Sequence, residues 1–146
     1  MHQEEISSKL KSLRLGAMAN EYLRQEELPA YVSLAFEERF IQIVNAQLMD
    51  RMEKREKRLI KAANIRDETA RLSLLEYLPE RNLDPHLVAE VSTMNWVEQG
   101  VSILVTGPTG VGKTYVVSGI SFEACRQSYS VKSFRSTRLI TALDAS

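Results

Sequence analysis

Apolar positions in the first part of the chain recur every three or four residues, which is typical of helices that pack on one side. Between residues 4 and 27 they form two stripes, one of Ile6, Leu10, Leu13 and Ala17 and one of Leu15, Met18 and Tyr22. Gly16 could divide this segment into two short helices. A longer helix is predicted from 34 to 63, with a stripe of Phe36, Phe40, Val44, Leu48, Met52, Leu59 and Ala63. We expect that stripe to be buried against the first segment, as in a helical hairpin.

The pattern changes in the second part of the chain. Residues 101–106 form a short apolar run rich in β-branched residues, which predicts a buried strand. Around it we expect a weak helix over 67–78, a short helix over 85–91, a helix over 115–127, a second strand over 129–134 and a helix from 138. The predicted fold class is α/β. An all-α helical region covers residues 1–78, and the first part of a parallel β-sheet core with flanking helices covers 79–146.

Composition is that of a globular protein, with 44% apolar residues, 26% charged residues and a formal net charge of zero. Any attraction to nucleic acid must therefore come from a local basic surface. The single cysteine, Cys125, is interpreted as a small core residue of a helix. The acidic N-terminus is unlike a signal peptide, and no apolar run approaches the roughly 18 residues of a membrane span. We expect a cytoplasmic protein without membrane contact.

A phosphate-binding motif occupies the turn between the first predicted strand and the helix that follows. Residues 107–114 match G-x-x-x-x-G-K-[ST] at every fixed position. Glycines let backbone N–H groups surround a phosphate, Lys113 can reach the β- and γ-phosphates, and the Thr114 hydroxyl can bind Mg²⁺. We predict that ATP with Mg²⁺ is bound here by Gly107, Pro108, Thr109, Gly110, Val111, Gly112, Lys113, Thr114 and Tyr115.

A second pattern lies on the long predicted helix. Five basic residues fall within a sector of about 120° at 100° per residue: Arg51, Lys54, Arg55, Arg58 and Lys61. They form either a solvated helix surface or a face that contacts DNA phosphates without sequence preference. Trp96 could stack on a base, but packing ahead of a core strand is the favoured interpretation.

The residues for hydrolysis are less clear than those for binding. Phosphoryl transfer in this class uses an acidic residue on a second strand to hold Mg²⁺. Only Glu123 and Asp144 follow Thr114. Glu123 is expected on a helix surface, and Asp144 fits better at the end of a helix than at the end of a strand. The catalytic residues are therefore unknown.

The chain resembles the IstB-like ATP-binding proteins, helper ATPases of insertion-sequence transposition and relatives of the DnaC helicase loader within the AAA+ group. The resemblance covers essentially the whole chain. It rests on residues 10–19 (LKSLRLGAMA), 36–39 (FEER), 94–97 (MNWV) and 107–115. It implies a helical region that engages a transposase or a related replication protein. It also implies a P-loop NTPase core of the AAA+ type that assembles with further copies on DNA, with ATP.

Two departures from the family keep alternatives open. Tyr115 stands where the family often has His, and the family's acidic strand, polar sensor and intersubunit arginine have no counterpart here. The chain is therefore expected to be a truncated member. It is either an ATP-dependent transposition helper or a non-catalytic remnant that binds only a partner or a nucleotide. A small phosphate-loop kinase is a third and less favoured interpretation.

Overall fold

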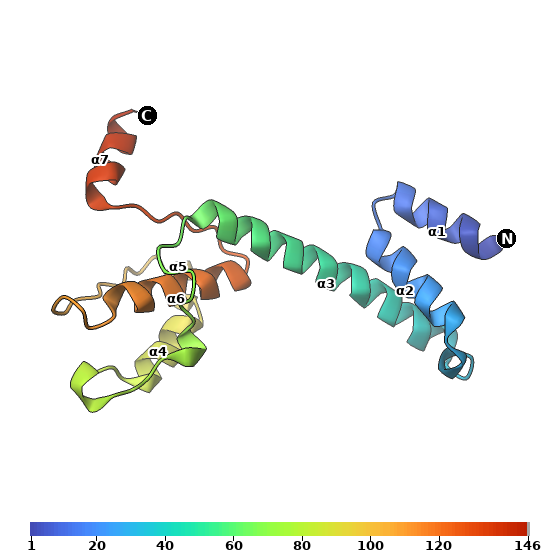
Figure 1. The fold of residues 1–146 in the computed structure, drawn as a ribbon, viewed down its shortest axis with the longest axis horizontal. Helices are drawn as coiled ribbons and strands as arrows, with labels where there is room; N and C mark the ends of the chain where they lie inside the picture. The colour runs from blue at the N-terminus through green and yellow to red at the C-terminus, as the bar shows by residue number, and fades with distance from the viewer. Residues whose placement is uncertain (146) are drawn as a thin grey trace. The chain divides into compact units, whose positions relative to one another are not determined.

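The computed structural model describes residues 1–145, and its contacts divide the chain into two compact units, Met1–Arg55 and Glu56 onward. Unit 1 contains α1 (His2–Ser12), α2 (Gly16–Glu27), a 3-10 turn η1 (Pro29–Tyr31) and most of α3 (Phe36–Ala63) (Figure 1). Unit 2 contains the end of α3, the 3-10 turns η2 (Leu72–Leu74) and η3 (Pro79–Arg81), and α4 (Pro85–Ser92), α5 (Asn95–Glu98), α6 (Lys113–Arg126) and α7 (Ser136–Asp144). The domain boundary predicted from composition, at residues 78–79, is a different division and stays a prediction.

In unit 1, α1 and α2 pack on each other and are joined by a tight turn. Arg14 adopts a left-handed conformation, with φ of 60°. The Leu15 N–H closes the turn by donating to the Leu10 carbonyl at 2.8 Å. The break falls directly before Gly16, so the predicted division into two short helices is confirmed.

Polar side chains join α2 to α3. The Gln47 side-chain oxygen accepts hydrogen bonds from the backbone N–H groups of Ala17 and Met18 at 3.1 and 3.2 Å. These N–H groups belong to the first turn of α2, where no carbonyl of the same helix is available. Gln25, which is 2% exposed, donates to the Arg39 carbonyl at 3.1 Å. The α3 face toward α2 therefore includes the buried residues Ile43 and Gln47.

The apolar stripe predicted to be buried is on the surface instead. We call its exposed part in unit 1 the outer face of α3, which consists of Phe36, Phe40, Ile41, Val44, Leu48 and Met52, each between 36% and 71% exposed. A four-residue spacing drifts by about 40° per step around a helix with 3.6 residues per turn. Gln47, a polar residue that the stripe omitted, lies on the packed side. The prediction of a buried stripe over residues 36–52 was therefore wrong, whereas Ala63 is fully buried in unit 2.

Unit 2 is organised around α6. Its buried residues Phe122, Ala124 and Cys125 join Ala63, Ala70, Val88 and Met94 in a small core. α4 begins as predicted, because the Asp84 carboxylate accepts a hydrogen bond from the His86 N–H at 2.9 Å and Pro85 occupies the first helical position. The weak helix predicted over 67–78 is not formed, and the short turn η2 stands there instead.

The predicted parallel β-sheet is absent from residues 1–145, so the α/β fold class was wrong for this structure, which is helical. Residues 101–106 and 129–134 run without helical structure, but neither segment has a neighbouring strand. In the described residues, Val101 N–H donates to Trp96 O and Ser133 N–H to Ala63 O, which are single contacts and not a ladder. β-branched residues favour a strand only where another edge can accept its hydrogen bonds. Leu104 is accordingly 87% exposed.

Candidate nucleotide-binding site

The phosphate-binding motif forms an irregular loop that ends at the first turn of α6. Gly110 and Gly112 have φ of +86° and +98°, in the region that favours glycine. Gly112 caps α6, and its carbonyl accepts from the Val116 N–H at 3.1 Å. The N–H groups before Val116 have no carbonyl within the helix, so they and the helix dipole favour an anion at this end.

Lys113 closes the loop on itself. Its Nζ donates a hydrogen bond to the Gly107 carbonyl, six residues earlier in the chain. The ammonium group is thereby held at the mouth of the loop. A phosphate oxygen would offer this ammonium a charged acceptor in place of the neutral carbonyl. The hydrogen bond to phosphate would be the stronger of the two.

The loop residues fit a bound polyphosphate. Nothing lies within 4 Å of the position that a Cβ would take on Gly110 or Gly112, so both backbones face open space. Thr114 is exposed on the first turn of α6. In the described residues no group of three or more His, Cys, Asp or Glu side chains could hold a metal ion. The Thr114 hydroxyl and the phosphates of the nucleotide are therefore the ligands on which Mg²⁺ would depend here.

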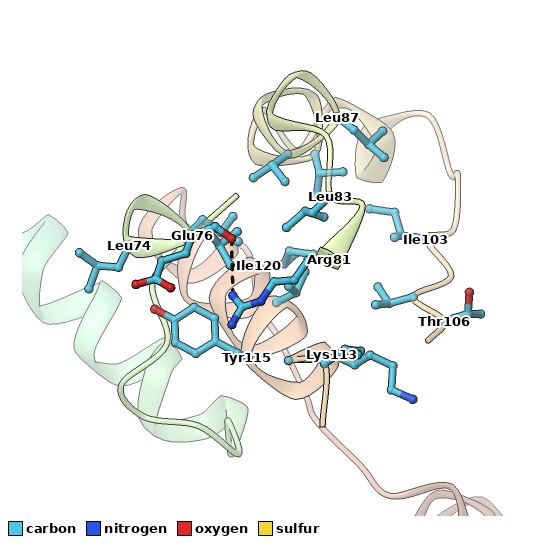
Figure 2. Close-up of a pocket in the computed structure, with 18 of the residues that line it drawn as sticks. Leu74, Glu76, Arg81, Leu83, Leu87, Ile103, Thr106, Lys113, Tyr115 and Ile120 are labelled. Atoms are coloured by element: carbon cyan, nitrogen blue, oxygen red, sulfur yellow. Dashed lines mark hydrogen bonds between the residues drawn. The ribbon is translucent and has the colours of Figure 1, made fainter. Parts of the chain in front are cut away.

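A cavity of about 650 Å³ adjoins the loop within unit 2 (Figure 2). Its walls are mostly apolar and come from η2, α4, residues 103–106 and α6. Gly112 and Lys113 line it at the loop, and Arg81 is a second basic residue in its wall. Arg81 donates to the Glu76 carbonyl at 3.5 Å, which Figure 2 shows as a dashed line. A cavity of this size and apolar character suits a nucleobase beside a phosphate site.

Tyr115 lines this cavity, and its hydroxyl also binds the backbone of the neighbouring segment at Arg71. Its hydroxyl accepts from the Arg71 N–H at 3.3 Å and donates to the Arg71 carbonyl at 3.2 Å. The Tyr115 hydroxyl therefore satisfies both backbone groups of one residue at the edge of η2. The residue that departs from the resembled family thus fixes a wall of the cavity.

The segment 67–72, which we call the strap, lies along one side of α6. Ser118 Oγ accepts from the Asp67 N–H at 3.2 Å, and the Arg71 guanidinium lies 3.9 Å from the centroid of the Phe122 ring. A Cβ on Gly119 would meet Leu72 Cδ2 at 3.0 Å. The α6 residues that contact the strap lie three or four residues apart, which places them on one side of the helix. They are Tyr115, Ser118, Gly119 and Phe122. Sequence reasoning missed the strap, although the small residues Ser118 and Gly119 side by side indicate a close approach of backbone.

The residues of the predicted basic face are all exposed on α3. Arg51, Lys54 and Arg55 belong to unit 1, and Arg58 and Lys61 belong to unit 2. Lys54 forms an ion pair with Asp50 at 2.9 Å, four residues earlier on the same helix. The structure thus leaves these side chains accessible to solvent, and their contact with DNA stays a prediction.

The two acids that follow the loop are both on helices. Glu123 accepts hydrogen bonds from Arg126 on α6, which hold the pKa of this carboxyl below its usual range, and Gln127 adds a further bond. Asp144 is the last residue of α7, in agreement with the interpretation of this segment as a helix. Neither side chain is among the cavity residues.

Two further sequence interpretations concern packing. The Trp96 indole N–H donates to the Val91 carbonyl at 2.9 Å and the side chain is half-buried, so its interpretation as a packing residue is confirmed. Cys125 is fully buried, which raises the pKa of its thiol, and the Glu56 carboxylate adds to the effect.

Comparison with known proteins identifies a family match over residues 8–146, to the family described as IstB-like ATP binding protein. A protein of insertion sequence IS1162 from Pseudomonas fluorescens, named as ATP-binding, is 39% identical over 98% of this chain and 62% of its own length. An IS5376 protein of Geobacillus stearothermophilus with a similar name is 22% identical over 97% of this chain and 54% of its own length. An IS21-like ATP-binding protein of Bacteroides fragilis is 31% identical over 49% of this chain.

The chain spans about six tenths of the first of these relatives and about half of the second. Among residues 1–145, no helix combines the length and the apolar character that crossing a bilayer requires.

Proposed function

Since the chain belongs to the family of IstB-like ATP binding proteins, we propose that it is a helper protein of DNA transposition that binds ATP with Mg²⁺ and acts with a transposase on DNA. The observation that carries the proposal is the loop at residues 107–114. Its glycines at positive φ, the N–H groups of the first turn of α6 and Lys113 are the groups that would bind an anion, and they adjoin a cavity. The relatives are insertion-sequence proteins named as ATP-binding, which supports the same role. The proposal places the chain in the cytoplasm.

Each part of the nucleotide has a candidate partner in unit 2. The backbone N–H groups of residues 110–115 would bind the phosphates, and Lys113 would exchange the Gly107 carbonyl for a phosphate oxygen. The Thr114 hydroxyl would hold Mg²⁺, which neutralises phosphate charge when bound. The apolar cavity walls at η2 and α4 would take the base. The strap, held by Tyr115, fixes the η2 wall.

Titration with a fluorescent ATP analogue in the presence of Mg²⁺ tests this proposal. The wild-type chain should bind, and Lys113→Ala should weaken binding at least about tenfold, because a charge-assisted contact to phosphate is lost. Lys132→Ala is the matched control, since Lys132 is exposed and outside the cavity. Equal affinities for all three chains would contradict a site at this loop.

A second candidate function is nucleotide binding without hydrolysis. It is favoured by the positions of the acids that follow the loop, because Glu123 is bonded to Arg126 and Asp144 ends α7. Release of inorganic phosphate from ATP, measured with the chain alone and with DNA, separates the two. Binding without release supports a binding module, whereas release that Lys113→Ala abolishes supports an ATPase.

A further inference from the structure

The two basic residues of the cavity wall belong to different sides of the cavity. Lys113 is the first residue of α6, and its Nζ is bonded to the Gly107 carbonyl of the loop. Arg81 is the last residue of η3, which lies between η2 and α4 in the chain. Figure 2 shows the Arg81 side chain reaching toward Glu76 and Tyr115, whereas the Lys113 side chain points the other way. Arg81 therefore belongs to the side with the apolar walls of η2 and α4, and Lys113 to the side of the loop.

A short turn fixes the backbone of Arg81 at this wall. The Arg81 N–H donates to the Leu78 carbonyl at 3.0 Å. Pro79 opens η3, and its carbonyl accepts from the Asn82 N–H at 3.3 Å. Asn82 then adopts a left-handed conformation with φ of 49°, which asparagine tolerates better than most residues. The sequence thus specifies a turn that presents one arginine to the cavity before α4 begins.

The charge of Arg81 is left without a counter-charge. Within the described part of the chain its guanidinium has one partner, the Glu76 carbonyl, at 3.5 Å. That distance is longer than an ordinary hydrogen bond, and the acceptor is a neutral backbone group and not the Glu76 carboxylate. Arg81 is exposed, and a guanidinium carries five N–H donors on a flat frame. The group is therefore available to a ligand in the cavity.

The cavity offers Arg81 no aromatic ring of the protein. Elsewhere in unit 2 the Arg71 guanidinium lies 3.9 Å from the centroid of the Phe122 ring, so a stacked arginine already occurs in this unit. Tyr115 is the single aromatic residue among the described residues that line the cavity, and no ring contact joins it to Arg81. A flat cation in a mostly apolar wall, without an aromatic partner, suits the face of a ring that a ligand brings.

We propose that the Arg81 guanidinium stacks on the base of the bound nucleotide, so that Arg81 makes the site prefer a nucleoside triphosphate to a bare polyphosphate. The inference rests on the proposed nucleotide function, in which Lys113 and the loop already serve the phosphates. Leu83 and Ile120 line the same cavity and would cover the base from its other sides. Stacking uses the π-face that every base has, so ring area and not hydrogen bonding would set the preference among bases.

Competition against the fluorescent ATP analogue tests the inference, with ATP and inorganic tripolyphosphate as competitors in the presence of Mg²⁺. Arg81→Ala should weaken ATP binding at least about fivefold and leave tripolyphosphate binding within about twofold of the wild type, because only the base loses a contact. Arg66→Ala is the matched control, since Arg66 is an exposed arginine of unit 2 outside the cavity. Unchanged ATP binding, or equal losses for ATP and tripolyphosphate, would overturn the contact with the base.

Two further variants separate the flat shape of the guanidinium from its charge. Arg81→Lys keeps the charge but not the plane, and it should bind ATP no more than about twofold more tightly than Arg81→Ala. Arg81→Phe keeps a plane without charge and should recover most of the lost affinity. A lysine variant that binds ATP as tightly as the phenylalanine variant, or more tightly, would rule out stacking. Circular dichroism checks that each variant folds, which the exposed position of Arg81 should allow.

The same titrations distinguish failure of this inference from failure of the proposed function. Lys113→Ala should weaken ATP and tripolyphosphate together, because both depend on the loop. A wild-type chain that binds neither would refute the nucleotide site and the role of Arg81 with it. Losses caused by Lys113→Ala but by none of the Arg81 variants would retain the site at the loop and overturn the role of Arg81 alone.

Discussion

At the scale of single residues, the loop at residues 107–114 depends on conformations that only glycine adopts without strain. Gly112→Ala places a Cβ on a residue with φ of +98°, which costs about 1–3 kcal/mol. It also puts that Cβ into the open space that a phosphate would use. We expect lower thermal stability and at least about tenfold weaker binding of the ATP analogue.

Gly16→Ala is the matched control for this prediction. Gly16 is the first residue of α2, a Cβ there meets nothing within 4 Å, and its φ is not positive. We expect this variant to be unchanged or more stable by up to about 1 kcal/mol, because alanine loses less chain entropy on folding. Equal responses of the two variants in thermal unfolding would contradict a special role for the loop conformation.

Tyr115 is the second residue whose role can be isolated, because phenylalanine removes only its hydroxyl. Tyr115→Phe loses both hydrogen bonds to the Arg71 backbone. We expect a loss of about 1 kcal/mol in stability and faster hydrogen exchange at the amide of Arg71. Tyr77→Phe, at a tyrosine that is 42% exposed, is the control. Unchanged exchange at Arg71 would show that the hydroxyl does not hold the strap.

At the scale of elements, the contact between α6 and the strap depends on the missing side chain of Gly119. A Cβ would meet Leu72 Cδ2 at 3.0 Å and the Leu72 backbone nitrogen at 3.3 Å. The backbone cannot move without breaking the contacts of Tyr115 and Ser118. Gly119→Ala should therefore destabilise unit 2 by about 1–3 kcal/mol, despite the higher helix propensity of alanine. Ser121→Ala on the same helix should change stability by less than about 0.5 kcal/mol in urea unfolding.

Elements that depend on local signals could be predicted from the sequence, and elements that depend on a distant neighbour could not. The helices at residues 2–12, 16–27, 36–63, 85–92, 113–126 and 136–144 follow from local signals such as the turn before Gly16 and the Asp84 cap. The loop geometry at Gly110 and Gly112 also follows from local signals. The sheet did not follow, because a strand depends on a neighbour that local propensity does not specify.

The side of α3 that is buried could not be predicted from the sequence either. Gln47 and Gln25 are buried because each bonds to backbone groups of another helix, and no periodicity of apolar residues can indicate such a bond. The stripe through Phe40 and Leu48 was therefore assigned to the wrong side of the helix. The strap at residues 67–72 was missed for a related reason, since Ser118 and Tyr115 of α6 hold it through hydrogen bonds to its backbone.

At the scale of the whole molecule, acid should loosen unit 1 through Glu26. Its carboxylate pairs with Arg39 and accepts a bond from Gln3 at 2.9 Å, so its pKa lies below the usual value of 4.5. The unfolded chain then binds more protons, and stability present above about pH 4.5 is lost as pH falls through the lowered pKa. Glu26→Gln should cost less than about 1 kcal/mol at neutral pH and flatten this dependence. Thermal unfolding at acidic and neutral pH, with Glu27→Gln as control, measures both effects.

DNA binding by the basic face also belongs to the whole molecule, because it acts through salt-dependent charge. Lys54→Ala, Arg55→Ala and Arg58→Ala together should weaken DNA binding and reduce the salt slope by about one for each charge removed. The control removes three exposed lysines that lie outside α3, Lys9, Lys11 and Lys132. A slope that both triple variants reduce equally would contradict a specific DNA-contacting face.

The position of Trp96 makes the two units distinguishable by spectroscopy. It is the single tryptophan of the chain and lies in unit 2, half-buried on α5 with its indole bonded to α4. Tryptophan emission excited selectively therefore reports unit 2 alone, whereas far-ultraviolet dichroism is dominated by all helices together. Unfolding curves followed by both signals will coincide if the units melt as one cooperative body and separate if they do not. The same emission offers a label-free signal for ligands that enter unit 2.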